Sequence, residues 1–316
     1  MSGHNLSQRG GSSYVLMTAA YNEEAYIEQT ITSVLGQTLR PQCWVIVSDG
    51  SKDRTDEIVQ AYARDFDFIR FLRVNRLPGR NFRSKVLALQ AGLNLIENLN
   101  YDFIGNLDAD VTVDPEYFQA LIHHFELRPE FGIISGFVHE QTRGEFRNRS
   151  SNRTGSVPHA AQLVRRECYQ AIGGYAVLKY GGEDWVAQTS AKMKGWRVES
   201  APNLKIFHHR HTGAGDNLLR DRFRLGRLDY SVGSDPVFEV LKCLQRLGEE
   251  PAVAGALARL LGFVWSSLIR EPRPVSDEFK AFLRQEQKAR VASLFHYFNS
   301  TSRKPPRGAK CRQLIR

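Results

Sequence analysis

Strand-like and helix-like segments alternate four times at the start of this chain, and this alternation most restricts its fold. Four apolar runs have the length of buried strands, at 14–20, 43–47, 68–74 and 103–107. Segments with apolar residues at helical spacing separate them, at 27–36, 55–64 and 80–98. Strands joined by helices in this way predict a mostly parallel α/β sheet with helices on both faces.

Polar residues stand where three of these strands end. Tyr21 and Asp108 directly follow a strand, and Asp49 lies just beyond another. Ligands of open α/β sheets gather beyond the carboxyl ends of the strands, so we expect these side chains to form a site. Asn22 is predicted to cap the first helix, with Glu23 and Glu24 in its first turn.

Two aspartates at the end of the fourth strand indicate a cation site. Asp108 and Asp110 are separated by one small residue, and alternate side chains of extended backbone share a side. Two like charges on one side repel unless a cation lies between them or both face water. Oxygen ligands suit Mg²⁺ or Mn²⁺. Taken alone, the pair is also typical of an acidic turn before a helix beginning near 114–116.

Several familiar site motifs are absent from the sequence. It contains neither G-x-G-x-x-G after the first strand nor G-x-x-x-x-G-K-[ST], which argues against dinucleotide and P-loop sites. Position 113, where an EF-hand loop counted from Asp108 needs glycine, is valine. G-x-S-x-G is missing as well, so a nucleophile elbow is not expected.

The net charge and the cysteines indicate the class of partner and the cellular compartment. The net charge of +9 suits a polyanionic partner such as a phosphate, an anionic lipid or a nucleic acid, or simply keeps the protein dissolved. Four cysteines without a C-x-x-C pair are typical of a reducing compartment, so we expect a cytoplasmic protein. Residues 1–13 are polar, without the apolar run of a secretory signal, and we expect them to be flexible. The sequence also lacks an apolar stretch long enough to span a bilayer.

The ordered motifs resemble those of a family 2 glycosyltransferase with the GT-A fold. The likeness runs over about 14–213, through A-A-Y-N-E-E at 19–24, D-G-S at 49–51, D-A-D at 108–110, I-G-G-Y at 172–175, G-E-D-W at 182–185 and K-G-W at 194–196. Many members have a proline just before the first motif, where this chain has Thr18 and Ala19. The resemblance implies an enzyme of the kind that builds bacterial surface or extracellular polysaccharides.

The resemblance also implies roles for individual residues in donor binding. Segments around Ala19, Tyr21, Asp49 and Ser51 would hold the nucleotide base, with Asp49 accepting a hydrogen bond from a ring N–H. Glu23 would lie near the ribose, Asp108 would face the ribose and the metal, and Asp110 would bind the metal that bridges the diphosphate.

Basic residues and histidines complete the expected donor site. Arg80 and Lys85 stand at a helix start, where a diphosphate gains from cations and from the helix dipole; Arg210 is a further candidate. The segment 203–213 reads as a strand ending in histidines. We expect His208 to complete the metal shell, as a histidine does in several GT-A enzymes, with His209 as the second choice.

Asp184 is the candidate general base. An inverting transfer needs one carboxylate within hydrogen-bond reach of the acceptor hydroxyl, while the metal stabilises the leaving diphosphate. The resemblance assigns the base to the aspartate of the Glu183–Asp184 pair, with Glu183 orienting it or holding the acceptor. Taken alone, the pair is typical of acids placed for the dipole of a helix start.

The last hundred residues change to helical patterns. We expect a GT-A domain over 14–215, a helical extension over 216–300 and a disordered basic tail over 301–316. Leu257, Leu261, Val264 and Leu268 recur at helical spacing, with Trp265 among them, and basic residues flank them at 259 and 270. Such a helix can lie in a bilayer interface, on the inner face of the cell membrane, or pack on the catalytic domain.

We therefore predict a metal-dependent, inverting glycosyltransferase that uses a UDP or GDP sugar. Its acceptor would be a glycan or a lipid-linked molecule, and an anionic membrane surface is a further expected partner. A sugar-nucleotide nucleotidyltransferase is one alternative, but it would need a glycine-rich, arginine-bearing loop after the first strand. A basic nucleotide- or RNA-binding protein is another, but its sheet would carry exposed aromatic residues, so we expect no nucleic acid partner.

Overall fold

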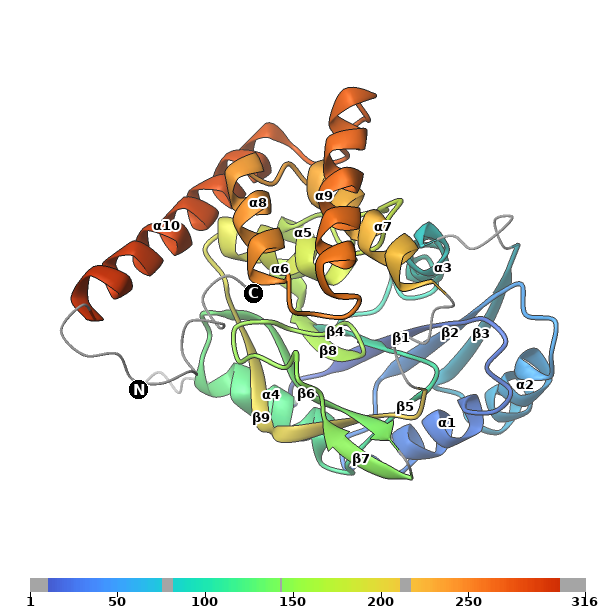
Figure 1. Ribbon diagram of the computed structural model, residues 1–316. Coiled ribbons are helices and arrows are strands. Elements are labelled where there is room, and N and C mark those ends of the chain that lie inside the picture. The colour runs from blue at the N-terminus through green and yellow to red at the C-terminus, as the bar shows by residue number, and fades with distance from the viewer. Residues whose placement is uncertain (1–10, 76–81, 143, 211–216, 302–316) are drawn as a thin grey trace, which may run out of the picture. The chain divides into compact units, whose positions relative to one another are not determined.

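The computed structural model describes residues 11–75, 82–142, 144–210 and 217–301 (Figure 1). These residues fall into two compact units. The first unit comprises the described parts of Met1–Arg80, Ser84–Gly174 and Lys194–Thr212, and the second those of Asn81–Arg83, Tyr175–Met193 and Gly213–Arg316. Arg80, the histidine at 211 and most of both expected flexible ends lie outside the described residues.

A nine-stranded sheet forms the centre of the first unit. Eight strands lie side by side in the order β3-β2-β1-β4-β8-β6-β9-β5, and β7 pairs with β6 outside this path. The strands are β1 (Tyr14–Ala20), β2 (Cys43–Asp49), β3 (Ile69–Val74), β4 (Phe103–Leu107), β5 (Val111–Val113), β6 (Phe131–Thr142), β7 (Glu145–Asn148), β8 (Ala161–Arg165) and β9 (Arg197–His208). The first four pair in parallel, as the strand–helix alternation predicts.

Alternate residues of the central strands pack against helices on the two opposite faces of the sheet. Leu16 and Ile46 belong to the main core, together with apolar residues of α1 (Ile27–Leu35), α2 (Thr55–Asp65) and α4 (Tyr117–Leu127). Met17 and Val47 point the other way, because they are the side chains nearest Gly92 of α3 (Arg83–Leu93). Buried strands that serve both layers explain why their sequences read as continuous apolar runs.

The second half of the sheet is mixed, which the sequence patterns did not reveal. β8 runs antiparallel to both β4 and β6, whereas β6 and β9 are parallel. The polar stretch at 142–157, which reads as a loop in the sequence, contains β7, a short strand with mostly exposed residues that forms a hairpin with β6. Its exposure explains the lack of an apolar pattern. The helix α5 (Arg166–Ala171) follows β8 and ends shortly before Gly173 and Gly174.

The start of α1 differs from the prediction. Asn22 does not cap this helix, which begins at Ile27 after Tyr26. Asn22 instead has a φ of 54°, and its side chain accepts a hydrogen bond from the backbone N–H of Lys52. An asparagine tolerates this left-handed backbone and can hydrogen-bond across a turn, so here it ties two loops together.

Five helices form the second unit: α6 (Glu183–Met193), α7 (Leu218–Ser231), α8 (Pro236–Gln245), α9 (Ala252–Leu268) and α10 (Asp277–Thr301). A small core joins α6, the carboxyl end of α7 and α10 through Val186, Val232 (directly after α7), Phe279 and Leu283. The helices α7 and α9 approach very closely, since a β-carbon at Gly226 would overlap the backbone oxygen of Arg259, and one at Gly262 that of Phe223.

Four charged side chains, three of them buried, gather where α7, α8 and α9 meet, and we call them the charge cluster: buried Asp229, Glu239 and Arg259 and half-buried Lys242. Arg259 donates to Asp229 and, over 2.9 Å, to Glu239. Lys242 donates to Asp229 over 2.8 Å. Two acids and two bases therefore neutralise one another. No helix of the described residues is long and apolar enough to cross a bilayer.

Candidate metal and nucleotide site

The carboxyl ends of three neighbouring parallel strands bring most of the predicted site together. β1 lies between β2 and β4, with Ala20 opposite Ser48 and Met17 opposite Asn106. Tyr21, Asp49 and Asp108 follow or end these strands, so they lie along one edge of the sheet. Asp49 is only 5% exposed, which is unusual for an acidic side chain.

The loops after β1 and β2 hold each other in place. The hydroxyl of Ser51 accepts from the backbone N–H of Asn22 over 3.2 Å, and that of Thr55 accepts from the N–H of Glu23 over 2.7 Å. Together with the bond from Lys52 to Asn22, these contacts fix the two loops as one rigid wall. Ala19 is half-buried at the end of β1, beside this wall.

Arg73 also contacts this wall, and the sequence analysis did not single it out. It lies near the end of β3, donates to the backbone oxygen of Ser51 over 3.0 Å and forms an ion pair with Asp56. A lone arginine in a strand has no sequence signal, and only the pairing of β3 with β2 brings it here.

Asp108, Asp110 and His208 form a group suited to a metal ion. Each offers one ligand atom, and these atoms all lie within 4.8 Å of one another. Asp108 and Asp110 follow β4, whereas His208 ends β9, which reaches them through its pairing with β5, where Val111 lies opposite His208. The expected grouping of two aspartates with a histidine is therefore present among the described residues.

The hydrogen bonds of His208 fix which ring nitrogen is available. Its Nδ1 lies 2.5 Å from the backbone oxygen of Arg210, which can only accept, so Nδ1 carries a hydrogen. In the neutral ring Nε2 then presents a lone pair, and it lies 3.6 Å from Oδ1 of Asp110. Two acceptors facing each other at this distance are what a divalent cation needs, and a backbone carbonyl behind the histidine is a common support for a metal ligand.

The pKa values of the carboxyl groups at this site also favour a bound cation. Burial raises the pKa of Asp110, and repulsion from Asp108 adds to this, while His208, Arg210 and Lys85 oppose it. Burial also raises the pKa of Glu23 to about 8, with Asp110 as the next cause. Three crowded carboxylates therefore favour a nearby cation.

In this structure two basic side chains provide positive charge beside these carboxylates. Lys85 in α3 donates to Asp108 over 2.6 Å. Arg210 forms an ion pair with Glu23, and its Nε lies 3.6 Å from Asp110. Both residues were predicted to bind a diphosphate, and both stand directly beside the group that would hold the metal.

His209 has different surroundings from His208. Its Nε2 lies 2.9 Å from the hydroxyl of Thr112, and its ring stacks on Tyr26 and meets the edge of Phe146. Burial lowers the pKa of His209. It does not belong to the three-residue group, so the geometry favours His208 as the metal ligand.

The candidate base lies in the second unit. Glu183 and Asp184 occupy the first turn of α6, and Oδ1 of Asp184 accepts from the backbone N–H of Trp185 over 2.7 Å. Both side chains are half-buried. Negative charge in a first helical turn is favoured by the helix dipole.

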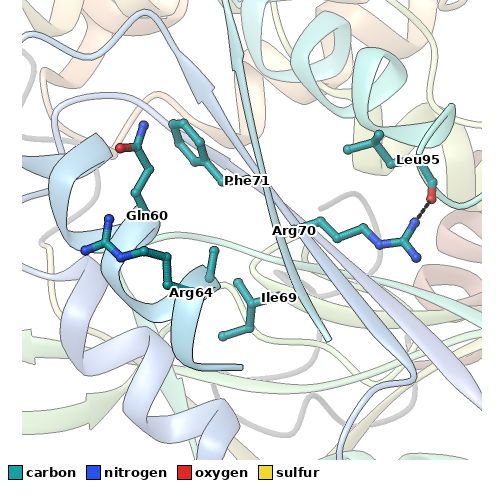
Figure 2. Close-up of a pocket in the computed structure, with 7 residues that line it drawn as sticks. Gln60, Arg64, Ile69, Arg70, Phe71 and Leu95 are labelled. Atoms are coloured by element: carbon teal, nitrogen blue, oxygen red, sulfur yellow. Dashed lines mark hydrogen bonds between the residues drawn. The ribbon is translucent and has the colours of Figure 1, made fainter. Parts of the chain in front are cut away.

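A surface hollow in the first unit lies apart from these residues. It is lined by side chains of α2 and β3 together with Leu95, and Figure 2 shows Arg70 hydrogen-bonded to the backbone oxygen of Leu95. Arg64 and Arg70 line it, but it contains no carboxylate or histidine and none of the predicted site residues. Its lining therefore offers no carboxylate or imidazole ligand for a divalent cation.

A family comparison covers much of this site. Residues 16–180 match the family model described as Glycosyl transferase family 2. Poly-beta-1,6-N-acetyl-D-glucosamine synthase of Staphylococcus aureus is 31% identical over 147 residues, 46% of this chain and 32% of the relative. The enzyme of the same name from Staphylococcus epidermidis is 32% identical over 143 residues, 45% of this chain and 30% of the relative. The matches thus span about a third of these relatives.

Two solved structures share the fold. TarS 1-349 of S. aureus, in complex with UDP-GlcNAc, has a TM-score of 0.53 at 14% identity, covering 91% of this chain and 87% of that one. The mannosyltransferase PcManGT from Pyrobaculum calidifontis, in complex with GDP-Man and Mn²⁺, has a TM-score of 0.51 at 15% identity, covering 97% and 86%. The predicted α/β sheet with flanking and C-terminal helices is confirmed by this likeness.

Proposed function

This chain belongs to glycosyl transferase family 2, and from that premise we propose that it transfers a sugar from a nucleotide sugar to a glycan or lipid-linked acceptor. The observation that carries the proposal is the group of Asp108, Asp110 and His208 at the sheet edge that also carries Asp49. The product would be a surface or extracellular polysaccharide. N-acetylglucosamine is the first sugar to test, since two relatives are named as its polymerising synthases.

We assign donor binding to the edge of the first unit. Asp49 accepts from a ring N–H of the base, beside Ala19, Tyr21 and Ser51, and the bonds between the two loops support a rigid base site. Glu23 lies toward the ribose. Preformed walls of this kind reduce the entropy cost of binding a ligand.

Asp110, Asp108 and His208 would hold a Mg²⁺ or Mn²⁺ ion. Such an ion, when bound, neutralises charge on the leaving diphosphate. Lys85 and Arg210 would move from their carboxylate partners to the diphosphate oxygens, because the same cationic groups can bind either. Arg80, outside the described residues, is proposed for the same role.

Asp184 is proposed to take the proton from the acceptor hydroxyl while that oxygen attacks the anomeric carbon of the donor. The carbon–oxygen bond to the diphosphate breaks on the opposite side, so the configuration inverts. Glu183 orients Asp184 or holds the acceptor. The half-buried first turn of α6 supports this role, since a general base must be ionised and reachable.

A donor screen tests the proposal. Release of UDP or GDP from a panel of nucleotide sugars, with a mixed glycan acceptor, should reveal one preferred donor and should require Mn²⁺ or Mg²⁺. Asp110→Asn should abolish release, while Glu57→Gln, an exposed carboxylate on α2, should not. Release that is unchanged in chelator would contradict the metal assignment, and no release with any donor would contradict glycosyl transfer.

A further inference from the structure

The helix α9 exposes most of its large apolar side chains and buries small and polar ones, which is the reverse of the usual arrangement in soluble proteins. Its large apolar side chains are 42–73% exposed, and we call them the α9 outer face: Val253, Leu257, Leu261, Val264, Trp265 and Leu268. The inward side carries Gly255, Ala256, Arg259, Gly262, Phe263 and Ser266, which are buried. Apart from Phe263, no large apolar residue of this helix is buried, so hydrophobic burial of its leucines and valines does not hold it in place.

Close backbone contact and ion pairs hold α9 instead. Gly226 of α7 and Gly262 of α9 leave no room for a β-carbon against the facing backbone. Arg259, the one charged residue of α9, is neutralised in the charge cluster. Small residues and polar pairs are how helices associate in lipid, where large apolar side chains face outward.

The neighbouring helix α8 repeats this reversal. Val237, Val240 and Leu244 are 42–67% exposed, whereas Glu239 is fully buried. These exposed positions recur at helical spacing, so α8 also presents an apolar stripe. The helix α8 therefore adds a second exposed apolar stripe to the same unit as α9.

Basic residues gather at the carboxyl end of α9. Lys179 and Arg227 both bond to Glu271, the residue shortly after this end. Arg270 is exposed beside it, and Arg273 stacks on Tyr230. Two of these four cations pair with one carboxylate, and we call Lys179, Arg227, Arg270 and Arg273 the α9 basic end. In the sequence Arg259 also counted as a flanking cation, but it is buried, so this expectation was wrong.

We propose that the α9 outer face docks onto the surface of an anionic lipid bilayer. At 17 residues, α9 is about 25 Å long and lies in the interface rather than across it. Trp265 and the α9 basic end then meet the headgroup layer, where an indole N–H and cations find partners. Lipid fits better than a protein, because among the six residues of this face only Trp265 can form a side-chain hydrogen bond, whereas protein interfaces have a polar rim.

Docking on a bilayer would give the proposed sugar transfer a location, but the docking proposal does not depend on the proposed transfer. A lipid-linked acceptor stays at the bilayer surface, so an enzyme held there meets it by diffusion in two dimensions. Vesicle binding without sugar transfer would count against the proposed function alone, and transfer without vesicle binding against this inference alone.

Co-sedimentation with vesicles tests the docking. The full chain should sediment with phosphatidylglycerol vesicles, less with phosphatidylcholine vesicles, and less as salt is raised. Replacing both Leu261→Ser and Trp265→Ser should lower the bound-to-free ratio by about tenfold or more, since each loses apolar contact with lipid. Leu127→Ser, which changes an equally exposed leucine of the first unit, should bind like the parent.

Further readings separate lipid from other occupants. Brominated lipids should quench tryptophan fluorescence in the parent and much less in Trp265→Phe. Equal vesicle binding by the double variant would overturn the proposal. A lowered thermal midpoint with unchanged binding would show that the face packs on the rest of the chain. A parent that ignores vesicles and forms a dimer that the double variant dissociates would show a second copy instead.

Discussion

Replacing Glu23 by glutamine should stabilise the protein by an amount that grows with pH. Glu23 is 9% exposed, and burial, with repulsion from Asp110 and Asp108, raises its pKa from 4.5 to about 8 against the opposing effect of Arg210. The folded protein therefore prefers the neutral side chain, which glutamine imitates. The ionised carboxylate of Glu23 therefore destabilises the folded protein, although the proposed donor site uses it.

The magnitude follows from the difference between the two pKa values. Because the folded pKa is the higher one, the contribution of Glu23 to stability is fully present below pH 4.5 and is lost as the pH rises through about 8. At 1.36 kcal/mol per unit, the loss reaches about 3 kcal/mol at pH 7 and about 5 kcal/mol above pH 8. Partial solvent access and the loss of the Arg210 pair make these upper values.

Urea unfolding in chelator at pH 5, 7 and 9 measures this effect. The free energy of unfolding of Glu23→Gln should exceed that of the parent little at the lowest pH and most at the highest. Glu57→Gln is the opposite control, because Arg54 lowers the pKa of exposed Glu57, so its loss should not stabilise at high pH. A constant difference between Glu23→Gln and the parent across this range would refute the reasoning.

Three further predictions follow from the other sites. Asp110→Asn should keep the fold but lose both sugar transfer and the rise in thermal midpoint that Mn²⁺ gives the parent; calorimetry showing the same rise would place the ion elsewhere. Asp184→Asn should leave nucleotide affinity within a few-fold but lower single-turnover transfer by about two to four orders of magnitude, the usual contribution of a general base; a parent-like rate would point to Glu183. Arg259→Met should lower the free energy of unfolding by about 3–5 kcal/mol, because two buried carboxylates keep only one cation, and exposed Arg270→Met should change it little.

The first half of the fold could be predicted because its strands are buried on both faces. Their apolar runs are unambiguous, and parallel pairing brings their carboxyl ends to one edge, which is enough to group Asp49 with Asp108. The strand β7 could not be predicted, since its exposed side chains leave no apolar pattern. The antiparallel insertion of β8 was also missed, because pairing direction depends on tertiary contacts rather than on local sequence.

The candidate site could likewise be predicted from the sequence only in part. The sequence selects Asp108 and Asp110 and prefers His208 to His209, and the hydrogen bonds of both rings give the structural reason for that preference. Asn22 looks like a helix cap, yet it bridges two loops, because its partner Lys52 lies thirty residues away. On α9, periodicity finds the apolar stripe, but only the packing shows that Arg259 faces inward with the glycines.

The pairing of β5 with β9 sets the order in which the metal group can form during synthesis. Both aspartates leave the ribosome early, with the parallel half of the sheet, whereas His208 follows only when β9 has been made. Contacts so distant in sequence form slowly, because a long loop must close first. A nascent chain therefore holds an incomplete set of the proposed ligands until its sheet is closed, so the candidate cation site is complete only at the end of folding.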